Sequence, residues 1–295
     1  GIHWKQIYQP NIAIPGLKIL DRSKHSEIEV QQVLTDWQSS FDLEQGPLFQ
    51  VGYVHGYEDG SARIYFALHH LIVDGVSWRL LTEDIKALYE GKKLPAKGSS
   101  YRQWTERVKK YGEEQLSEDK YWREQLNALP DYHTKEKEQE ASGASFELDK
   151  ELTQSLLQQA PKAYHTEIND LLLTALAYAL KGMNGQDIQG ITLEGHGREE
   201  IDHSIDHSRT VGWFTTMFPV KLQLQGTVEE SIQFIKESLR SIPHKGIGFG
   251  SFATKKEAGY TLKDLAPISF NYLGQFDIQQ GYWRIVSEQS GTNTH

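Results

Sequence analysis

Residues 63–81 constrain the fold of this chain more than any other stretch, because their pattern changes from that of a strand to that of a helix within a few positions. Side chains that share one face alternate along the first part: Ile64, Phe66, Leu68 and His70. A period of two is the pattern of an extended strand. Two histidines close this strand, and many α/β enzymes place a titratable catalytic group at the end of a packed strand.

A tight turn and a helix are expected after the two histidines. Asp74-Gly75 predicts the turn, since glycine adopts backbone angles that other residues avoid. Ser77 is the expected N-cap of the helix. The apolar positions of this helix recur at helical spacing: Leu80, Leu81, Ile85 and Leu88.

Length and composition limit the class of protein. A chain of 295 residues suggests about two domains, and 38 % hydrophobic residues are enough for real cores. The net charge of −9 argues against a nucleic-acid-binding protein, which needs a basic face. The absence of cysteine excludes disulfides, thiolate metal sites and a cysteine nucleophile, and it fits a reducing, cytoplasmic location. No apolar run approaches the roughly 20 residues of a membrane span and no signal peptide is visible, so no membrane partner is expected.

Helix-start signals and turn residues organise the first half of the chain. Residues 48–57 and 61–70 predict a β-hairpin, joined across an acidic, glycine-containing turn. A long helix or helix pair is expected later and ends at Pro130, which cannot continue a helix. Two capping boxes mark helix starts: Ser26 with Glu29, and Ser100 with Gln103. The first of these helices carries an apolar stripe: Val30, Val33, Leu34, Trp37 and Phe41.

Residues 131–145 are polar, charged and rich in lysine and glutamate, which is typical of a linker. We place a domain boundary there, so that residues 1–135 form one domain and residues 136–295 the other. The second domain is expected to contain, in order, a strand at 144–148, helices at 151–159 and 167–181, a strand at 188–194, an apolar stretch at 211–224, a helix from Thr227 to Ile242 and a strand at 268–276.

The first string that could carry chemistry is His-His-Leu-Ile-Val-Asp-Gly at residues 69–75. His70 suits a general base, because histidine gains and loses a proton near neutral pH. Asp74 would orient His70 or hold the turn. The alternative is that both histidines are packed polar groups, which is the commoner outcome for an isolated pair. A metal site is disfavoured, because no further suitably spaced ligand lies nearby.

The second string, Glu-Gly-His-Gly-Arg at residues 194–198, places a carboxylate at the end of a strand. Its glycines let the backbone approach a ligand closely, and a buried glutamate can carry a proton at neutral pH. A tight turn with solvated charges explains the string equally well. His203 and His207 follow four residues apart in a repeated Asp-His-Ser, where a solvated loop is favoured over a pair of ligands.

Two further strings complete the set. Residues 209–220 read as an apolar core strand with a glycine bend. Residues 270–277 include Asn271 and Tyr272, which are either polar groups of an active site or ordinary strand residues. Neither a Gly-x-x-x-x-Gly-Lys phosphate loop nor a Gly-x-Ser-x-Gly elbow occurs, which disfavours nucleotide-dependent enzymes and serine hydrolases.

Taken together, these strings resemble the motifs of the condensation-domain superfamily of nonribosomal peptide synthetases, whose signature is His-His-x-x-x-Asp-Gly. The continuation Val-Ser-Trp-Arg at residues 76–79 is closer to the epimerization domains than to the domains that form peptide bonds. Further strings resemble the epimerization domains and occur in the expected order: those at 194–199, 209–220, 243–250 and 270–277. The resemblance spans most of the chain.

The resemblance implies a mixed α/β fold of two chloramphenicol-acetyltransferase-like lobes in a V arrangement, with an active-site tunnel between them. The N-terminal lobe, residues 1–135, would carry the His-His motif. The C-terminal lobe, residues 136–295, would carry the motifs at 194–199 and 270–277. Domains of this family are usually longer on both sides of these motifs, so both lobes are expected to be truncated.

The resemblance also implies a chemistry: L to D interconversion at the Cα atom of an aminoacyl or peptidyl thioester. The thioester would be held on the phosphopantetheine of a peptidyl carrier protein domain, among adjacent synthetase modules. The thioester acidifies the Cα–H bond, so no cofactor is expected. His70 and Glu194 would be the catalytic groups, on opposite faces of a planar enolate. Residues of the same motifs receive secondary roles: His69, Asp74 and Arg198 as supports, and Asn271, Tyr272 and Trp213 in the pocket.

Two alternatives remain open at this stage. The first is a condensation domain that joins two carrier-bound substrates, and the Glu194 string together with the Val-Ser-Trp continuation argues against it. The second is an inactive member of the superfamily that serves as a docking scaffold for carrier proteins. The presence of both His70 and Glu194 argues against loss of activity.

Overall fold

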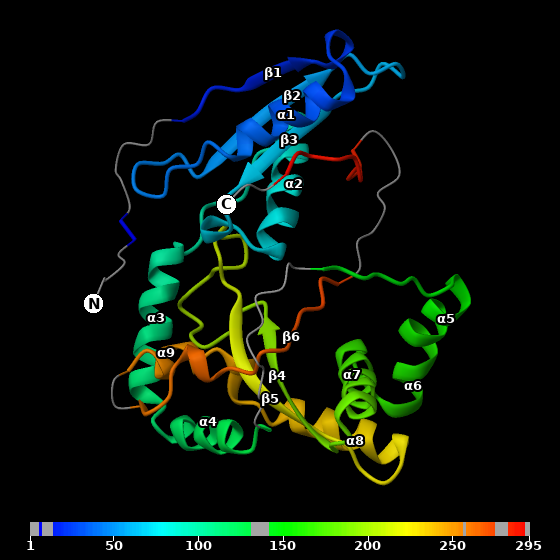
Figure 1. Ribbon diagram of the computed structural model, residues 1–295. Coiled ribbons are helices and arrows are strands. Elements are labelled where there is room, and N and C mark those ends of the chain that lie inside the picture. Colours follow the sequence, from blue (N-terminus) through cyan, green and yellow to red (C-terminus); the bar gives the residue numbers. More distant parts are fainter. Residues whose placement is uncertain (1–5, 8–13, 131–141, 256–257, 275–282, 293–295) are drawn as a thin grey trace. The chain divides into compact units, whose positions relative to one another are not determined.

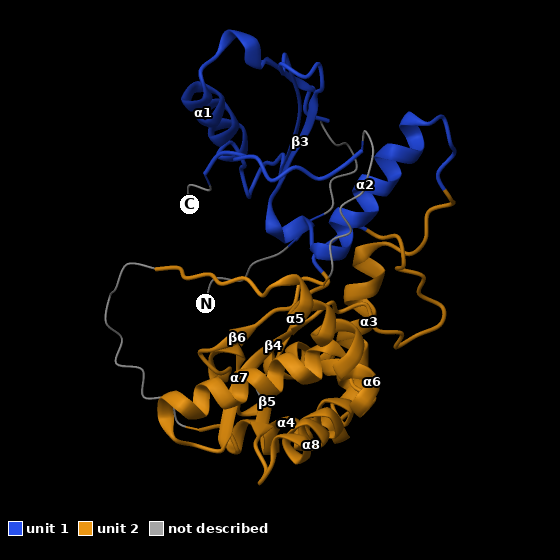
Figure 2. Ribbon diagram, turned by 90° about the vertical axis from the view of Figure 1, so that its right-hand side faces the viewer, with its two compact units in different colours: residues 1–94, 211–213, 276–295 blue, residues 95–210, 214–275 orange. Residues whose placement is uncertain are grey.

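The computed structural model describes residues 6–7, 14–130, 142–255, 258–274 and 283–292. The chain divides into two compact units, coloured blue and orange in Figure 2. Unit 1 comprises residues 1–94, 211–213 and 276–295, and unit 2 comprises residues 95–210 and 214–275. Each unit therefore combines segments that are distant in the sequence.

Within the described residues, unit 1 contains a sheet in the order β1-β2-β3 with a helix packed on it (Figure 1). β1 (Lys18–Asp21) runs parallel to β2 (Phe49–His55), and β2 pairs antiparallel with β3 (Arg63–Leu68). The predicted hairpin is therefore confirmed. α1 (Glu27–Gln38) begins at the predicted capping box, in which the side chain of Ser26 and that of its partner three residues later bond reciprocally to backbone N–H groups.

The core of unit 1 lies between α1 and the sheet. Val30 and Leu34 of the helix belong to the same buried cluster as Tyr65 and Ala67 of β3. The face of β3 that carries Ile64 is consequently the outer one. Other apolar residues, most of them from the predicted helix stripe, are partly buried against this cluster: Val33, Trp37, Phe41 and Tyr57.

A short 3-10 turn, η2 (His70–Ile72), and the helix α2 (Gly75–Tyr89) follow β3. The prediction that Ser77 caps this helix is wrong. Asp74 is the N-cap, and its Oδ1 atom accepts a hydrogen bond of 2.7 Å from the backbone N–H of Ser77. An N-cap side chain reaches the second or third residue after it, so Ser77 lies one turn too late to cap the helix itself. Gly75 is the first helical residue and does not adopt a positive φ.

The far C-terminal segment also belongs to unit 1. The backbone oxygens of Gln289 and Ser290 accept hydrogen bonds from glutamine side chains of α1. The carboxylate of Glu288 accepts from the guanidinium of Arg63, with 2.7 Å between Oε1 and Nη2. Residues 283–292 therefore lie along the helix and the sheet of unit 1, an arrangement that no sequence pattern predicted.

Within the described residues, unit 2 contains a second sheet, in the order β5-β4-β6. β4 (Ile188–Gly195) pairs antiparallel with β5 (Thr216–Gln223) and parallel with β6 (Ser269–Phe270). Two long helices, α7 (Ile168–Asn184) and α8 (Val228–Arg240), pack against β4 and β5 (Figure 1). The other described helices of unit 2 are α3 (Tyr101–Glu114), α4 (Ser117–Asn127), α5 (Lys150–Gln154), η3 (Ser155–Gln159), α6 (Ala160–Tyr164), η4 (Pro243–Gly246), α9 (Phe249–Ala253) and η6 (Leu262–Asp264).

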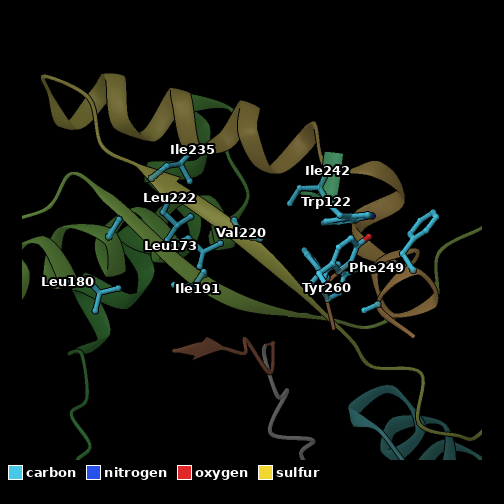
Figure 3. Close-up of a cluster of buried hydrophobic side chains, with 14 of the residues drawn as sticks. Trp122, Leu173, Leu180, Ile191, Val220, Leu222, Ile235, Ile242, Phe249 and Tyr260 are labelled. Carbon is cyan, nitrogen blue, oxygen red and sulfur yellow. The ribbon is translucent and has the colours of Figure 1, made fainter. Parts of the chain in front are cut away.

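The main core of unit 2 lies where α4, α7 and α8 meet the two long strands (Figure 3). Four fully buried side chains come from four different elements: Trp122 from α4, Leu173 from α7, Ile191 from β4 and Ile235 from α8. Burying a side chain of this size is worth about 1.5–3 kcal/mol. This packing anchors β4, the strand whose last residues begin the Glu-Gly-His-Gly-Arg string.

The helix starts predicted in unit 2 are confirmed. α3 begins at the Ser100–Gln103 capping box and α8 at a box formed by Thr227 and Glu230. The predicted long helix is a pair, α3 and α4, and it ends shortly before Pro130. Among the described helices, none combines the length and the apolar character that crossing a bilayer requires.

Two predicted strands differ from the structure. Residues 144–148 have no regular structure, and Phe146 is 87 % exposed, so this apolar alternation has no sheet to join. The strand predicted at 268–276 is reduced to β6, because Ser269 and Phe270 are the residues of its described part that pair with β4. Residues 275 and 276 lie outside the described residues.

The predicted domain boundary between residues 135 and 136 also lies outside the described residues. The compact units divide the first half of the chain elsewhere, after Leu94. The physical reason is the packing of α3 and α4. Trp104 of α3 shares a buried cluster with Phe214 and Ile247, and α4 contributes Trp122 to the main core of unit 2.

Candidate functional site

His70 lies directly after β3, where the pairing of β2 and β3 fixes the path of the chain. The backbone N–H of His69 donates to the carbonyl of Leu48 at 2.8 Å, which continues the hairpin past the end of β3. The Nδ1 atom of His69 accepts from the backbone N–H of Leu71 at 3.2 Å, so this side chain caps η2. His69 thereby fixes the direction in which the backbone leaves β3. This backbone direction in turn determines where the side chain of His70 can point.

The exposed ring of His70 packs edge-to-face against Trp213, with ring centroids 5.2 Å apart and planes at 68°. Aromatic pairs of this geometry contribute about 0.5–1.5 kcal/mol beyond the area they bury. Ser77 brings the tryptophan there, because its Oγ donates to the carbonyl of Gly212 at 3.0 Å and accepts from the Gly212 N–H at 3.1 Å. Ser77 is fully buried. Residues 211–213 thus belong to unit 1, although the rest of the 209–220 string belongs to unit 2.

Asp74 is buried, with 5 % of its surface exposed, and it caps α2 through the backbone N–H of Ser77. A carboxylate at a helix N-terminus is also stabilised by the helix dipole. Asp74 therefore fixes the start of α2 and, with it, the buried hydroxyl of Ser77. This geometry fits the predicted supporting role better than a role as a direct proton donor.

Glu194 is half-buried near the end of β4, opposite Met217 of β5. The side-chain amide of Asn271 donates to its Oε2 atom at 2.7 Å. The parallel pairing of Leu193 with Phe270 accounts for this contact, because it places the next residue of each strand side by side. The structure thus brings together two residues of the predicted site, 77 positions apart. Tyr272 follows on the same segment and is half-buried.

The segment after Glu194 is a tight loop closed by ion pairs. The Nε2 atom of His196 lies 3.0 Å from Oε1 of Glu199, and Nζ of Lys245 lies 3.5 Å from Oε2. Burial by itself would raise the pKa of Glu199, but the hydrogen bond and charge of His196 and the charge of Lys245 outweigh it and hold the pKa below its usual value. Gly197 is required at φ 62°, since an added Cβ would lie 1.6 Å from the carbonyl oxygen of Phe214.

Arg198 points its guanidinium into the same loop region. Its Nη1 donates to the backbone oxygens of His207 at 3.1 Å and Thr210 at 2.8 Å, and the guanidinium lies 3.8 Å from the centre of the Phe214 ring. The expectation of a solvated loop is wrong for His207, which is 8 % exposed and stacks on Trp104 at 4.2 Å. Arg198 therefore holds the loop of residues 207–210 against unit 2.

The predicted site residues fall into two groups, one in each unit. The group in unit 1 consists of His69, His70, Asp74 and Trp213. The group in unit 2 consists of Glu194, Arg198, Asn271 and Tyr272. Residues 275–277 of the fourth string lie outside the described part of the chain. In the described ranges, no cluster of three or more His, Cys, Asp or Glu side chains could hold a metal ion.

Sequence reasoning missed two participants in these groups. Ser77, expected to cap a helix, instead fixes the backbone that carries Trp213. Lys245, in the Pro-His-Lys-Gly string, has no expected role from the sequence, and in the structure it pairs with Glu199. The resemblance of residues 243–250 to a family motif is the signal that could have singled out Lys245. Nothing local in the sequence indicates that Glu199 is its partner.

Known proteins match this chain over most of its length. The family model described as "Condensation domain" matches residues 5–292. N-(5-amino-5-carboxypentanoyl)-L-cysteinyl-D-valine synthase of Amycolatopsis lactamdurans is 37 % identical over 302 residues, which cover 98 % of this chain and 8 % of the synthase. The chain thus corresponds to a small part of that relative.

Solved structures share the fold. The epimerization domain from the third module of tyrocidine synthetase B matches with a TM-score of 0.74 and 38 % identity, covering 88 % of this chain and 63 % of that domain. The first condensation domain of the calcium-dependent antibiotic synthetase matches with a TM-score of 0.56 and 20 % identity, covering 77 % of this chain and 55 % of that one. These matches confirm the mixed α/β fold class that the sequence predicted.

Proposed function

This chain belongs to the condensation-domain family, and we propose that within the family it catalyses epimerization at the Cα atom of an aminoacyl or peptidyl thioester. The thioester would be attached to the phosphopantetheine arm of a carrier-protein domain, within a multidomain peptide synthetase. The name of the Amycolatopsis relative, which includes D-valine, supports a product of D configuration. The higher identity to an epimerization domain, 38 % against 20 % for a condensation domain, supports the same choice.

The observation that carries the proposal is the oriented carboxylate of Glu194. In condensation an amine attacks the thioester carbonyl, and no proton moves at Cα. Epimerization needs two titratable groups, one to remove the Cα proton and one to return a proton from the other face. A carboxylate held at a strand end by the Asn271 amide, 2.7 Å away, supports the second reaction, which needs a titratable group in addition to His70.

The proposed reaction is a pair of proton transfers. A base takes the Cα proton, and the electron pair of the C–H bond moves into the thioester carbonyl to form an enolate. A protonated group then delivers a proton to Cα from the opposite face, and the electrons return, so nothing is oxidised or reduced. His70 and Glu194 are the two groups we propose. Exchange with water restores their protonation after each turnover.

Neighbouring residues would prepare these two groups. The hydrogen bond from Asn271 occupies Oε2 of Glu194 and leaves Oε1 to exchange the proton. The edge-to-face contact with Trp213 restricts the ring of His70. Tyr272 would donate a hydrogen bond to the developing enolate oxygen, the kind of electrostatic contribution that is often large in enzymes. The thioester itself supplies the acidity at Cα, so the proposal includes no cofactor.

Solvent exchange tests this function directly. The protein would be incubated in D₂O with an L-aminoacyl thioester on a holo carrier domain, and the released amino acid analysed for Cα deuterium and chirality. The proposal predicts deuterium at Cα in both enantiomers. The ratio of the D to the L form should approach an equilibrium value with time.

Two outcomes would overturn the proposal. Retention of protium in a product that stays entirely L excludes epimerization under these conditions. Formation of a peptide when a second loaded carrier domain is added, without exchange at Cα, assigns the chain to condensation instead. A parallel reaction without the protein corrects for spontaneous racemisation of the thioester.

A further inference from the structure

The turn at His244–Gly246 in unit 2 has an unusual backbone. Three successive residues adopt positive φ: His244 at 39°, Lys245 at 49° and Gly246 at 85°. In this region the Cβ of a residue other than glycine lies too close to its own backbone, which makes the conformation unfavourable. Two such residues in succession persist only where the surroundings hold them, and strain of this kind gathers at functional sites.

A buried pair of side chains from α3 and α4 holds the turn. Tyr111 is 3 % exposed and Glu118 is 8 % exposed. The Tyr111 hydroxyl donates to Oε1 of Glu118, which uses its single proton, so Nδ1 of His244 donates in turn to the Tyr111 oxygen at 2.5 Å. Burial, together with the hydrogen bond to Glu118, raises the pKa of Tyr111 and keeps its hydroxyl protonated.

The pair meets the turn at a second point, and the turn also rests on the sheet. An added Cβ on Gly248 would lie 2.6 Å from Oε2 of Glu118, so the chain after the turn passes directly over this carboxylate. An added Cβ on Gly246 would lie 2.1 Å from the ring of Phe218 in β5. The turn is therefore clamped between the Tyr111–Glu118 pair and the strand next to β4.

The other side of the turn contacts the segment that follows Glu194. The carbonyl oxygen of Lys245 lies 3.6 Å from the position that a Cβ on Gly195 would take. The ammonium group of the same lysine lies 3.5 Å from Glu199, which also binds His196. Lys245 thus touches residues near both ends of the loop that leaves β4.

We propose that Tyr111 and Glu118 are positioning residues for the Glu194 loop and act through the clamped His244–Gly246 turn. They touch neither Glu194 nor, in the proposed reaction, the substrate. Their effect is to hold Lys245 in a strained conformation. In this conformation its carbonyl oxygen lies next to Gly195 and its ammonium group pairs with Glu199. The link to catalysis rests on the function proposed above, whereas the link from Tyr111 to Glu199 is independent of it.

Unit 2 contains a matched control for this pair. Tyr260 is 7 % exposed, and its hydroxyl donates to Asp119, the residue after Glu118 on α4, at 3.0 Å. Tyr260→Phe therefore removes a hydroxyl from a second tyrosine–carboxylate contact on the same helix. In the described part of the chain, the Tyr260 ring stacks on Phe249 and lies near the Arg123 guanidinium, both outside the His244–Gly246 turn.

The first measurement follows the carboxyl carbon of Glu199 by NMR titration of the full chain, with the signal assigned by its loss in Glu199→Gln. Lys245→Met removes the ammonium group, so the pKa of Glu199 should rise. The proposal predicts that Tyr111→Phe also raises this pKa, because the released turn withdraws Lys245, and that Tyr260→Phe does not. An unchanged pKa in Tyr111→Phe, or an equal rise in Tyr260→Phe, overturns the proposal.

A second variant guards against misfolding of Tyr111→Phe. His244→Gly removes the imidazole that contacts Tyr111 and relieves the strain at φ 39°, and the His244 side chain is half-exposed. A stable variant in which the pKa of Glu199 rises supports the clamp. A stable variant in which the pKa of Glu199 stays at the wild-type value shows that the turn keeps its conformation without the clamp.

The second measurement is the rate of Cα deuterium exchange. We expect Tyr111→Phe to lower kcat about tenfold with KM for the loaded carrier domain unchanged, and Tyr260→Phe to keep the wild-type kcat. Combining Tyr111→Phe with Lys245→Met should lower kcat little further than either change alone, since both act through one turn. Fully additive losses contradict the proposal. A wild-type chain without exchange refutes the proposed function, and the titration still decides whether the clamp exists.

Discussion

Replacing Ser77 with alanine removes the hydroxyl that ties residues 211–213 to unit 1. The Oγ atom of Ser77 makes two hydrogen bonds to the backbone of Gly212, at 3.0 and 3.1 Å, and the serine is fully buried. Alanine leaves the carbonyl and the N–H of Gly212 without these partners. An unsatisfied buried polar group costs about 1–3 kcal/mol; at about 1–2 kcal/mol for each of the two Gly212 groups, we expect a loss of about 2–4 kcal/mol.

The loss of stability should be local, because Gly212 belongs to the short segment 211–213, which lies outside any sheet. In Ser77→Ala the local opening of this segment should become roughly 30- to 700-fold more frequent, since each 1.4 kcal/mol corresponds to a factor of ten. Native-state hydrogen exchange at the amide of Gly212 measures this opening. Trp213 should at the same time lose its fixed contact with His70, which changes its fluorescence.

Ser231→Ala is the matched control. Ser231 is also fully buried, and its Oγ accepts from the backbone N–H of Gln225 and donates to the carbonyl of Thr227, both at 2.8 Å. This variant should lose comparable stability in unit 2 while the amide of Gly212 keeps its wild-type protection. Wild-type protection of Gly212 in Ser77→Ala would refute the reasoning.

Three further predictions follow from single contacts. Asp74→Ala removes the N-cap of α2 and should destabilise unit 1 by about 1 kcal/mol in urea unfolding, whereas Asp74→Asn keeps most of the cap; equal losses would argue against capping. Asn271→Leu removes the donor to Glu194 and should lower the kcat of Cα exchange about tenfold with little change in KM; a raised KM at constant kcat would assign Asn271 to substrate binding instead. Hydrogen bonds from the side chain and backbone of Ser204 lower the pKa of Asp202 from 3.8 to about 2. Because the folded state favours the ionised form, this contribution to stability is complete above pH 3.8 and is lost as the pH falls towards 2, so Asp202→Asn should flatten that part of the pH–stability curve; an unchanged acid limb would contradict it.

The features that could be predicted from the sequence are those whose physical cause is local. The capping boxes that open α1 and α3 each depend on two side chains three residues apart, and both are confirmed. The cap of α2 was missed, because Asp74 and Ser77 are both good N-cap residues and stand three positions apart. Only the path of the turn decides which of them faces the free N–H groups.

The prediction of a strand at 144–148 is wrong for a related reason. Alternating apolar side chains predict a strand only if a neighbouring strand supplies backbone partners, and strand pairing is a tertiary property. Phe146 remains 87 % exposed outside any sheet. The two-residue β6 shows the same dependence, since its extent is set by its register against β4.

The candidate site shows the same limit at longer range. His70 and Glu194 could be singled out because titratable residues at strand ends are visible in the sequence, and their catalytic roles stay predictions. Their supporting contacts could not be foreseen, since Ser77 and Gly212 are 135 positions apart and Glu194 and Asn271 are 77 positions apart. No local pattern records which of many polar residues will meet across such separations.

Deuterium exchange from each enantiomer, in variants of the two proposed catalytic groups, tests the central claim most directly. Glu194→Gln and His70→Ala would each be given the L- and the D-aminoacyl thioester on a carrier domain in D₂O, with Glu229→Gln, an exposed glutamate of α8, as the control. With two bases on opposite faces, each variant should lose exchange from a different enantiomer, neither should invert its substrate, and the control should match the wild type. Inversion near the wild-type rate in either variant would remove that residue from the mechanism and contradict the account.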